Sequence, residues 1–184
     1  MLVQIVATIT TLVPIIANLC APFLVKLTTK RNLMVGGSFV HMGGLLIIFF
    51  GGTNVPVLLA GAVIAAAGYG LKGSMHFAMQ PDPVDYGEWK SGVNTAGTLS
   101  AVNGFVGKVG MAIASSIGAA LLQFGGFDAT QTIQTVTAQH YITAMYIWVP
   151  ILTNIATIVT MMFYDLDKIY PQIIKELDER RANA

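Results

Sequence analysis

Long apolar stretches separated by short polar segments run through the whole chain. Five of them are long enough to cross a bilayer, at about residues 2–25, 33–50, 55–79, 95–124 and 142–164. The hydrocarbon core of a membrane is about 30 Å thick and a helix rises about 1.5 Å per residue, so roughly 20 mostly apolar residues make one span. The pattern predicts an all-α membrane protein, with a transmembrane helical bundle over residues 1–164.

The composition supports the same class and excludes several others. Of the 184 residues, 54% are hydrophobic and only 10% are charged, whereas soluble domains carry about 25% charged residues. Cys20 is the only cysteine, so an internal disulfide is impossible and a cysteine metal site has no support. No basic segment precedes the first apolar run, so we expect that run to be a retained span rather than a signal peptide. We expect no nucleic-acid partner.

The basic residues outside the apolar stretches all fall on one side of the predicted membrane. They are Lys26, Lys30, Arg31, Lys90, Lys168, Lys175, Arg180 and Arg181. The connections on the opposite side, 51–54 and 125–141, contain no Lys or Arg. Because short loops rich in Lys and Arg stay in the cytoplasm, we expect a multi-pass protein of the cell (inner) membrane, with its N-terminus outside and its C-terminus in the cytoplasm.

The last segment, residues 165–184, differs from the rest of the chain. Charges of both signs appear, and Ile169, Ile173, Ile174 and Leu177 recur at helical spacing. This pattern predicts a short amphipathic helix at the cytoplasmic surface. The favoured interpretation is a solvated end that satisfies the topology, and we assign the tail no recognition role.

Three carboxylates crowd into the connection after the third predicted span, QPDPVDYGEW at 80–89. A catalytic pair needs a pocket that holds two carboxylates in distinct environments, and the sequence shows none. A hard-cation site needs more oxygen ligands than Asp82, Asp85 and Glu88 supply, and the glycine pattern of a calcium loop is missing. The prolines on either side of the first carboxylate should end the preceding helix. The interpretation favoured by these residues is a structural hinge.

The same connection carries a recognisable motif. Its residues are Asp82, Asp85, Tyr86, Gly87, Glu88, Trp89, Lys90 and Gly92, and a long helix with a central lysine follows. This arrangement resembles the glycoside-pentoside-hexuronide cation symporters, the melibiose-carrier family within the major facilitator superfamily. In that family the motif lies in the cytoplasmic loop between helices ten and eleven. After the motif glycine the family commonly has an arginine and then an acidic residue. This chain has Val93, Asn94, Thr95 and Ala96 there, which weakens any inherited charge contact.

The resemblance implies that the five spans correspond to helices eight to twelve of a twelve-helix transporter. Such a carrier moves a sugar inward with sodium or a proton, by alternating access about a central site. The expected partners are membrane lipid, a small sugar or glycoside, and the missing amino-terminal helices, which hold the family's cation-binding acidic residues. No Asp or Glu lies inside any of the five predicted spans. We therefore expect this chain to be only the carboxy-terminal portion of a carrier, through truncation, a split gene or a misplaced start.

Lys108 is the strongest candidate for the transport site. An ammonium near the middle of a span costs several kcal/mol unless it faces water or a partner, and the ends of this span are too distant for easy snorkelling. By resemblance, a lysine here lies close to the sugar and cation sites. Asn103 and Ser115 are assigned to the Lys108 side of the helix and complete the predicted vicinity. The alternative is a structural lysine bonded to backbone carbonyls.

Four other polar residues inside the spans receive structural interpretations. Lys72 should reach the headgroup region as an anchor, and His76 should hydrogen-bond to a neighbour rather than sense protons. Asn18 and Asn154 are each expected to bond between helices.

Three classes of function remain open from the sequence. The favoured one is a segment of a sugar symporter. The alternatives are a remnant or membrane interaction subunit without transport, and a membrane enzyme that uses the carboxylates at 82–88. We do not expect an enzyme, a catalytic residue or a metal site.

Overall fold

The computed structural model describes residues 2–131 and 133–182, and within them every regular element is a helix. The first four predicted spans are found as α1 (Leu2–Val25), α2 (Lys30–Gly51), α3 (Val55–Ala78) and α5 (Ala96–Phe124). The fifth consists of α6 (Val136–Thr143), the π-helical turn η1 (Ala144–Trp148) and α7 (Val149–Met162). Among the described residues, five helical segments are long and apolar enough to cross a membrane, which confirms the predicted all-α membrane fold.

The chain forms two compact units. The first contains the chain up to Thr95 and again from Thr153 onward, and the second contains Ala96–Leu152. The first unit therefore holds α1 to α3, most of α7, and two further helices, α4 (Asp82–Ser91) and α8 (Leu166–Ala182).

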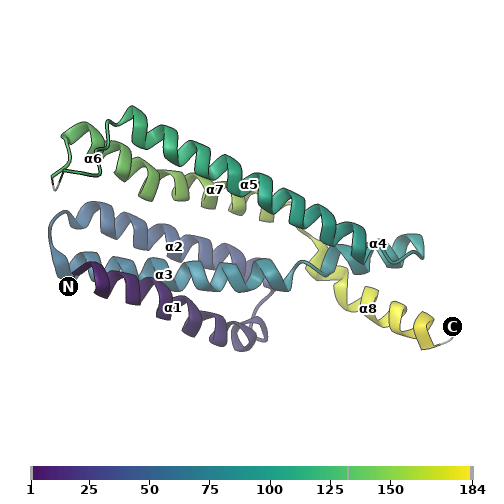
Figure 1. Ribbon diagram of the computed structural model, residues 1–184. Coiled ribbons are helices and arrows are strands. Elements are labelled where there is room, and N and C mark those ends of the chain that lie inside the picture. The colour runs from purple at the N-terminus through teal and green to yellow at the C-terminus, as the bar shows by residue number, and fades with distance from the viewer. Residues whose placement is uncertain (1, 132, 183–184) are drawn as a thin grey trace. The chain divides into compact units, whose positions relative to one another are not determined.

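In the first unit, α2 and α3 pack along a seam of small residues, and α1 lies against α3 (Figure 1). Gly44 of α2 faces the backbone of Ala65, and Gly68 of α3 faces the backbone of Gly37 and His41. A β-carbon at Gly44 or Gly68 would lie closer than 3.0 Å to that backbone. Close backbone approach at small residues is typical of helix pairs in membranes, and here it fixes which residues of α2 and α3 face each other.

Helix ends in this unit are capped by side chains, as the polar connections suggest. Thr29 accepts a hydrogen bond from the backbone N–H of Asn32 at 3.1 Å. The carboxylate of Asp167 accepts one from the backbone N–H of Arg31 at 2.8 Å. A carboxylate opposes the positive end of a helix favourably, so the start of α8 helps to complete the start of α2.

The tail is docked, and the solvated-end interpretation is wrong. It forms α8, whose residues Ile173 and Leu177 are only 1% and 2% exposed, and α8 packs against α4. Both elements can be followed in Figure 1. Burial of two large aliphatic side chains contributes roughly 1.5–3 kcal/mol each, so the tail adds to the stability of the first unit.

In the second unit, α5 leaves all of its residues at least partly exposed. Its contact with the following segment is local, since Gly125, just after α5, lies against the ring of Tyr141 in α6. The connection between α5 and α6 is ordered by Asp128, whose carboxylate accepts hydrogen bonds from the backbone and hydroxyl of Thr130 at 2.9 and 2.7 Å. The long apolar surface of α5 is therefore not covered within its own unit.

Candidate functional site

Asp82, the first residue of the motif, is the centre of a buried cluster. It opens α4 directly after Pro81 and is fully buried. Its Oδ1 accepts a hydrogen bond from Lys30 Nζ at 2.6 Å, and its Oδ2 accepts one from the Tyr164 hydroxyl at 2.9 Å. Lys30 Nζ also donates to the backbone carbonyl of Ala78 at 3.1 Å. The carboxylate thus joins the start of α2 to the segment after α7, and Lys30 links this pair to the end of α3.

Asp85 lies one turn further along α4 and binds the tail. The Tyr170 hydroxyl of α8 donates to its Oδ2 at 2.7 Å, and Lys30 Nζ lies 4.6 Å from the centre of the Tyr170 ring. Burial raises the pKa of Tyr164 and of Tyr170. The hydrogen bond to Asp82 raises the pKa of Tyr164 further, and the hydrogen bond to Asp85 raises that of Tyr170 further. Both phenols therefore stay protonated and keep donating at neutral pH.

Glu88 lies near the end of α4 and forms a salt bridge with Arg181 of the tail. Arg181 donates from Nη2 and Nε to its Oε1 at 2.9 and 3.3 Å, and Asn94 donates from Nδ2 to its Oε2 at 2.7 Å. Glu88 holds the pKa of Arg181 above its usual value. Asn94, one of the positions that depart from the family pattern, thus contacts a motif carboxylate. The positive charge that pairs with this carboxylate is the guanidinium of Arg181 in the tail.

The aromatic and glycine residues of the motif complete this contact. The indole N–H of Trp89 donates to Glu176 of α8 at 2.6 Å, which lowers the pKa of Glu176. Tyr86 lies beside Trp89, with ring centres 6.0 Å apart, and the ammonium of Lys90 lies 5.8 Å from the Tyr86 ring. Gly92 ends α4 at φ +73°, a left-handed conformation that favours glycine.

We call these contacts the loop–tail network, formed by Lys30, Asp82, Asp85, Glu88, Trp89, Asn94, Tyr164, Tyr170, Glu176 and Arg181. All of its members lie in the first unit. Each motif carboxylate is hydrogen-bonded to a side chain from elsewhere in the chain. This geometry is that of a tertiary joint, because the carboxylates bind partners on other segments rather than converge on a shared open pocket.

Lys108 lies in a different unit from the loop–tail network, near the middle of the uncovered helix α5. Its side chain and those of Asn103 and Ser115 are exposed. In a continuous helix Ser115, two turns after Lys108, lies on the same face. Asn103, five residues before it, lies about 140° around the axis at about 100° per residue. The regular helix therefore groups Lys108 with Ser115, and the assignment of Asn103 to that face is corrected.

A polar network inside the first unit was missed by the sequence interpretation. Lys72 Nζ of α3 donates to Asn154 Oδ1 of α7 at 2.8 Å, and Asn154 Nδ2 lies 3.1 Å from His41 Nδ1 of α2. Asn154 is fully buried. The predicted bond between helices at Asn154 is confirmed, but the expectation that Lys72 is a headgroup anchor is wrong, because its ammonium hydrogen-bonds a buried amide. Three polar residues far apart in sequence carried no periodic signal that could have grouped them.

The two remaining intramembrane expectations agree with the structure. Asn18 of α1 accepts a hydrogen bond from the Ser74 hydroxyl of α3. His76 lies 3.5 Å, ring nitrogen to amide nitrogen, from Gln80.

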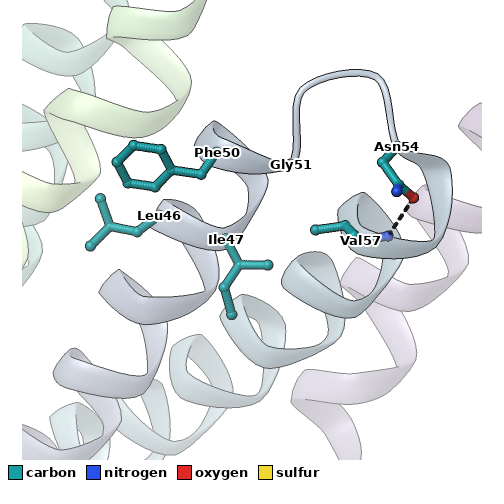
Figure 2. A pocket seen from close by; sticks show the side chains of 6 residues that line it. All are labelled: Leu46, Ile47, Phe50, Gly51, Asn54 and Val57. Atoms are coloured by element: carbon teal, nitrogen blue, oxygen red, sulfur yellow. Dashed lines mark hydrogen bonds between the residues drawn. The ribbon is translucent and has the colours of Figure 1, made fainter.

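An apolar pocket lies where α2 turns into α3, and Figure 2 shows its lining. Leu46, Ile47, Phe50 and Val57 supply most of the wall. The one polar side chain in it, Asn54, is used to cap α3 by accepting from the backbone N–H of Val57 at 3.5 Å. Since no converging polar groups line it, this pocket lacks the features of a sugar site.

The fold and these sites define a class, that of multi-pass α-helical membrane proteins with ionisable residues within their spans. Comparison with known proteins gives the family. Residues 1–168 match the model of the MFS/sugar transport protein family, and the chain belongs to that family. The resemblance to a major facilitator sugar symporter is thereby confirmed.

Two relatives illustrate the match. The isoprimeverose transporter of Lactiplantibacillus pentosus is 33% identical over 173 residues, which cover 93% of this chain and 36% of that protein. The glucuronide carrier protein homolog of Escherichia coli (strain K12) is 32% identical over 162 residues, which cover 87% of this chain and 35% of that protein. The chain spans about a third of the length of these curated relatives.

Proposed function

We propose that this chain forms the carboxy-terminal portion of a secondary active sugar carrier of the inner membrane. The observation that carries the proposal is the family match over residues 1–168. The names of the relatives point to glycosides and sugar acids as the substrate class. The complete carrier takes up a sugar together with sodium or a proton, by alternating access about a site near the bilayer centre.

The distribution of acidic residues supports the placement of the cation-coupling carboxylates on helices other than those of this chain. None of α1, α2, α3, α5 or α7 contains Asp or Glu. A sodium ion needs oxygen ligands, and carboxylates supply the charge that holds it. We infer that the coupling carboxylates belong to helices outside this chain. Those helices are its partner, and they cover part of the exposed surface of α5.

Lys108 and Ser115 are the residues of this chain that we place beside the sugar. An ammonium within a span is retained when it faces a water-filled cavity or a partner. Lys108 donates up to three hydrogen bonds and the Ser115 hydroxyl both donates and accepts, which suits a polyhydroxylated substrate. Asn103, displaced around the helix, is proposed to face a neighbouring helix at the edge of that cavity.

The loop–tail network is proposed to act on the cytoplasmic side as part of the gate. It includes residues of the C-terminal tail, on the side of the membrane that the basic residues predict to be cytoplasmic. Because it joins α2, α4 and α8 through hydrogen bonds, it must adjust when the helices rearrange. Asp85→Asn should therefore alter the rate of conformational exchange more than sugar affinity. Tyr170→Phe, which removes the hydroxyl that Asp85 accepts from, should have the same effect.

The experiment that tests this function is sugar uptake by a chimeric carrier. Residues 1–168 replace the matching segment of the Lactiplantibacillus pentosus isoprimeverose transporter, and uptake of its labelled sugar is measured in cells lacking their own carrier. The expected result is saturable uptake that collapses when the membrane is depolarised and its ion gradients are dissipated. A chimera that reaches the membrane in normal amount but shows no sugar binding and no uptake would overturn the proposal.

A further inference from the structure

The half of α3 that the basic residues predict to be cytoplasmic carries a polar stripe. Tyr69, Lys72, Gly73 and His76 lie within one arc of about 100°, at about 100° per residue. Tyr69 is 58% exposed, His76 is exposed, and a β-carbon at Gly73 would meet nothing within 4 Å. We call these four residues the α3 stripe.

The packing of α3 leaves this stripe accessible within the described part of the first unit. Gly68 faces the backbone of α2, and Gly70 faces Pro14 and Ala17 of α1. The α3 stripe lies between these two contacts around the helix axis. Polar residues of a span face a water-filled cavity or another helix rather than lipid. The α3 stripe therefore belongs to a surface of the chain that lipid does not cover.

Lys72 has donors that its own chain does not use. Its Nζ donates to Asn154 Oδ1 at 2.8 Å, and this is its one hydrogen bond to the described residues. An ammonium has three N–H donors, so two remain for another acceptor. Its other contact is the ring of Tyr69, whose centre is 5.7 Å away. The Tyr69 hydroxyl likewise donates to no described residue, so the pair presents three donors at one place.

The charge of Lys72 is not balanced within the first unit's spans. None of α1, α2, α3 and α7 contains Asp or Glu, and Lys72 forms no ion pair with the described residues. A cation held inside a span favours an anionic partner. A carboxylate has two oxygens that only accept when it is ionised, which suits the remaining donors of Lys72 and Tyr69. The exposed ring of Tyr69 also offers an apolar face to the C–H groups of a sugar.

We propose that Lys72 and Tyr69 form the subsite that binds the carboxylate of a sugar acid, on a water-filled path lined by the α3 stripe. The inference rests on the proposed function and deepens it by assigning charge selectivity to α3. Asn154 holds the ammonium in place, and the ammonium and the Tyr69 hydroxyl donate to the carboxylate. A neutral sugar lacks the matching charge and gains little from Lys72.

The first test compares two sugars that differ at a single group. Methyl β-glucuronide has a carboxylate where methyl β-glucoside has a hydroxymethyl group. Each competes with labelled isoprimeverose for uptake by the chimeric carrier. Lys72→Met should raise the glucuronide concentration that halves uptake by about 10- to 100-fold, because a hydrogen-bonded charge partner is lost. The glucoside concentration that halves uptake should stay close to that of the parent.

Matched variants separate charge from packing. Lys72→Arg keeps the charge and should keep the preference for the glucuronide. Lys72→Gln removes the charge but retains a group that can donate to Asn154, so it should behave like Lys72→Met, and it replaces that variant if Lys72→Met does not reach the membrane. Tyr69→Phe removes one donor and should cause a smaller, still selective loss. Lys26→Met, an exposed lysine just after α1, is the control and should change neither competitor.

The second test needs no transport. Gly73→Cys is made in a cysteine-free chimera, and its reaction rates with an anionic and a cationic methanethiosulfonate reagent are measured. The ratio of the two rates cancels any change in the ionisation of the thiol itself. Relative to a small thiol in solution, the ratio should favour the anionic reagent by about tenfold, and Lys72→Met should remove this preference.

The outcomes decide the proposal. An equal loss of both competitors in Lys72→Met would mean that Lys72 pairs with a fixed carboxylate of the partner helices, and it would overturn the subsite. Failure of the glucuronide to inhibit the parent chimera, or inhibition that Lys72→Met leaves unchanged, would do the same. A chimera that inserts but takes up no sugar overturns the proposed function instead. The subsite is then decided by the thiol reaction, and equal rate ratios with and without Lys72 would overturn it.

Discussion

Replacing Asp82 by Asn tests whether the motif is a structural joint. The substitution keeps the size of the side chain and one oxygen, but it removes the charge that pairs with Lys30. The Asp82 side chain is 1% exposed and that of Lys30 is 22% exposed. In the variant the ammonium stays partly buried with only the carbonyl of Ala78 and a neutral amide to satisfy it.

The size of the effect follows from this burial. Removing one partner of a buried ion pair costs about 3–5 kcal/mol. Because Lys30 is partly exposed and can recover some hydration, we expect the lower end, about 3 kcal/mol. The matched control is Asp165→Asn. Asp165 pairs with Lys168 at 2.8 Å and with Arg31 at 3.4 Å, but the side chains of Asp165 and Lys168 are 65% and 72% exposed. Because water screens such exposed pairs, the loss of the Asp165 charge should change the stability little.

The assay is chemical unfolding of the full chain in detergent micelles, followed by circular dichroism, with parent and variants measured side by side. The midpoint should fall substantially for Asp82→Asn and barely for Asp165→Asn. Equal, small shifts for the two variants would refute the reasoning, because they would mean that the Lys30–Asp82 pair is no more important than a surface contact.

Three further predictions concern packing, titration and the tail. Gly44→Ala should destabilise the chain by about 1–3 kcal/mol through overpacking. Gly43→Ala should not, because a β-carbon there meets nothing within 4 Å. Thermal unfolding of the two variants checks this, and equal stabilities would contradict the close packing of α2 and α3 at Gly44. Tyr164 should ionise above its ordinary pKa of 10.0, so stability present below that value is lost as the pH rises through the higher folded-state value. In Asp82→Asn the Tyr164 titration, read from tyrosinate absorbance, should move down, and an unmoved titration would contradict the hydrogen bond. In a Trp148→Phe background, ending the chain after residue 164 should shift Trp89 fluorescence to the red because Glu176 and the tail no longer cover it; an unchanged spectrum would argue against tail docking.

The spans were predictable because their signal is local. A run of apolar residues of bilayer length specifies a helix wherever it lies, and the helices found over 30–51 and 96–124 begin and end within a few residues of the predicted ranges. The motif was also readable, since Pro81, Gly92 and the carboxylates mark the ends of α4 through backbone chemistry alone.

What the sequence did not reveal depends on contacts between distant residues. Arg181 meets Glu88 across 93 positions, and Lys72 meets Asn154 across 82. Charged residues in a tail look solvated unless their partners are known. A lysine in the cytoplasmic third of a span looks like an anchor unless an amide on another helix is known to lie beside it. Both errors came from assigning a polar residue by its own surroundings in sequence.

We propose that α5 lines the sugar pathway, and Lys108→Ala in the chimeric carrier is the direct test. We expect sugar uptake to be lost or no longer to depend on the driving cation, while the amount of protein in the membrane is unchanged. The control is Lys26→Ala in the same chimera, an exposed lysine just after α1, which should transport normally. Unchanged uptake and unchanged cation dependence in Lys108→Ala would mean that Lys108 is not part of the site and that its face of α5 does not line the pathway.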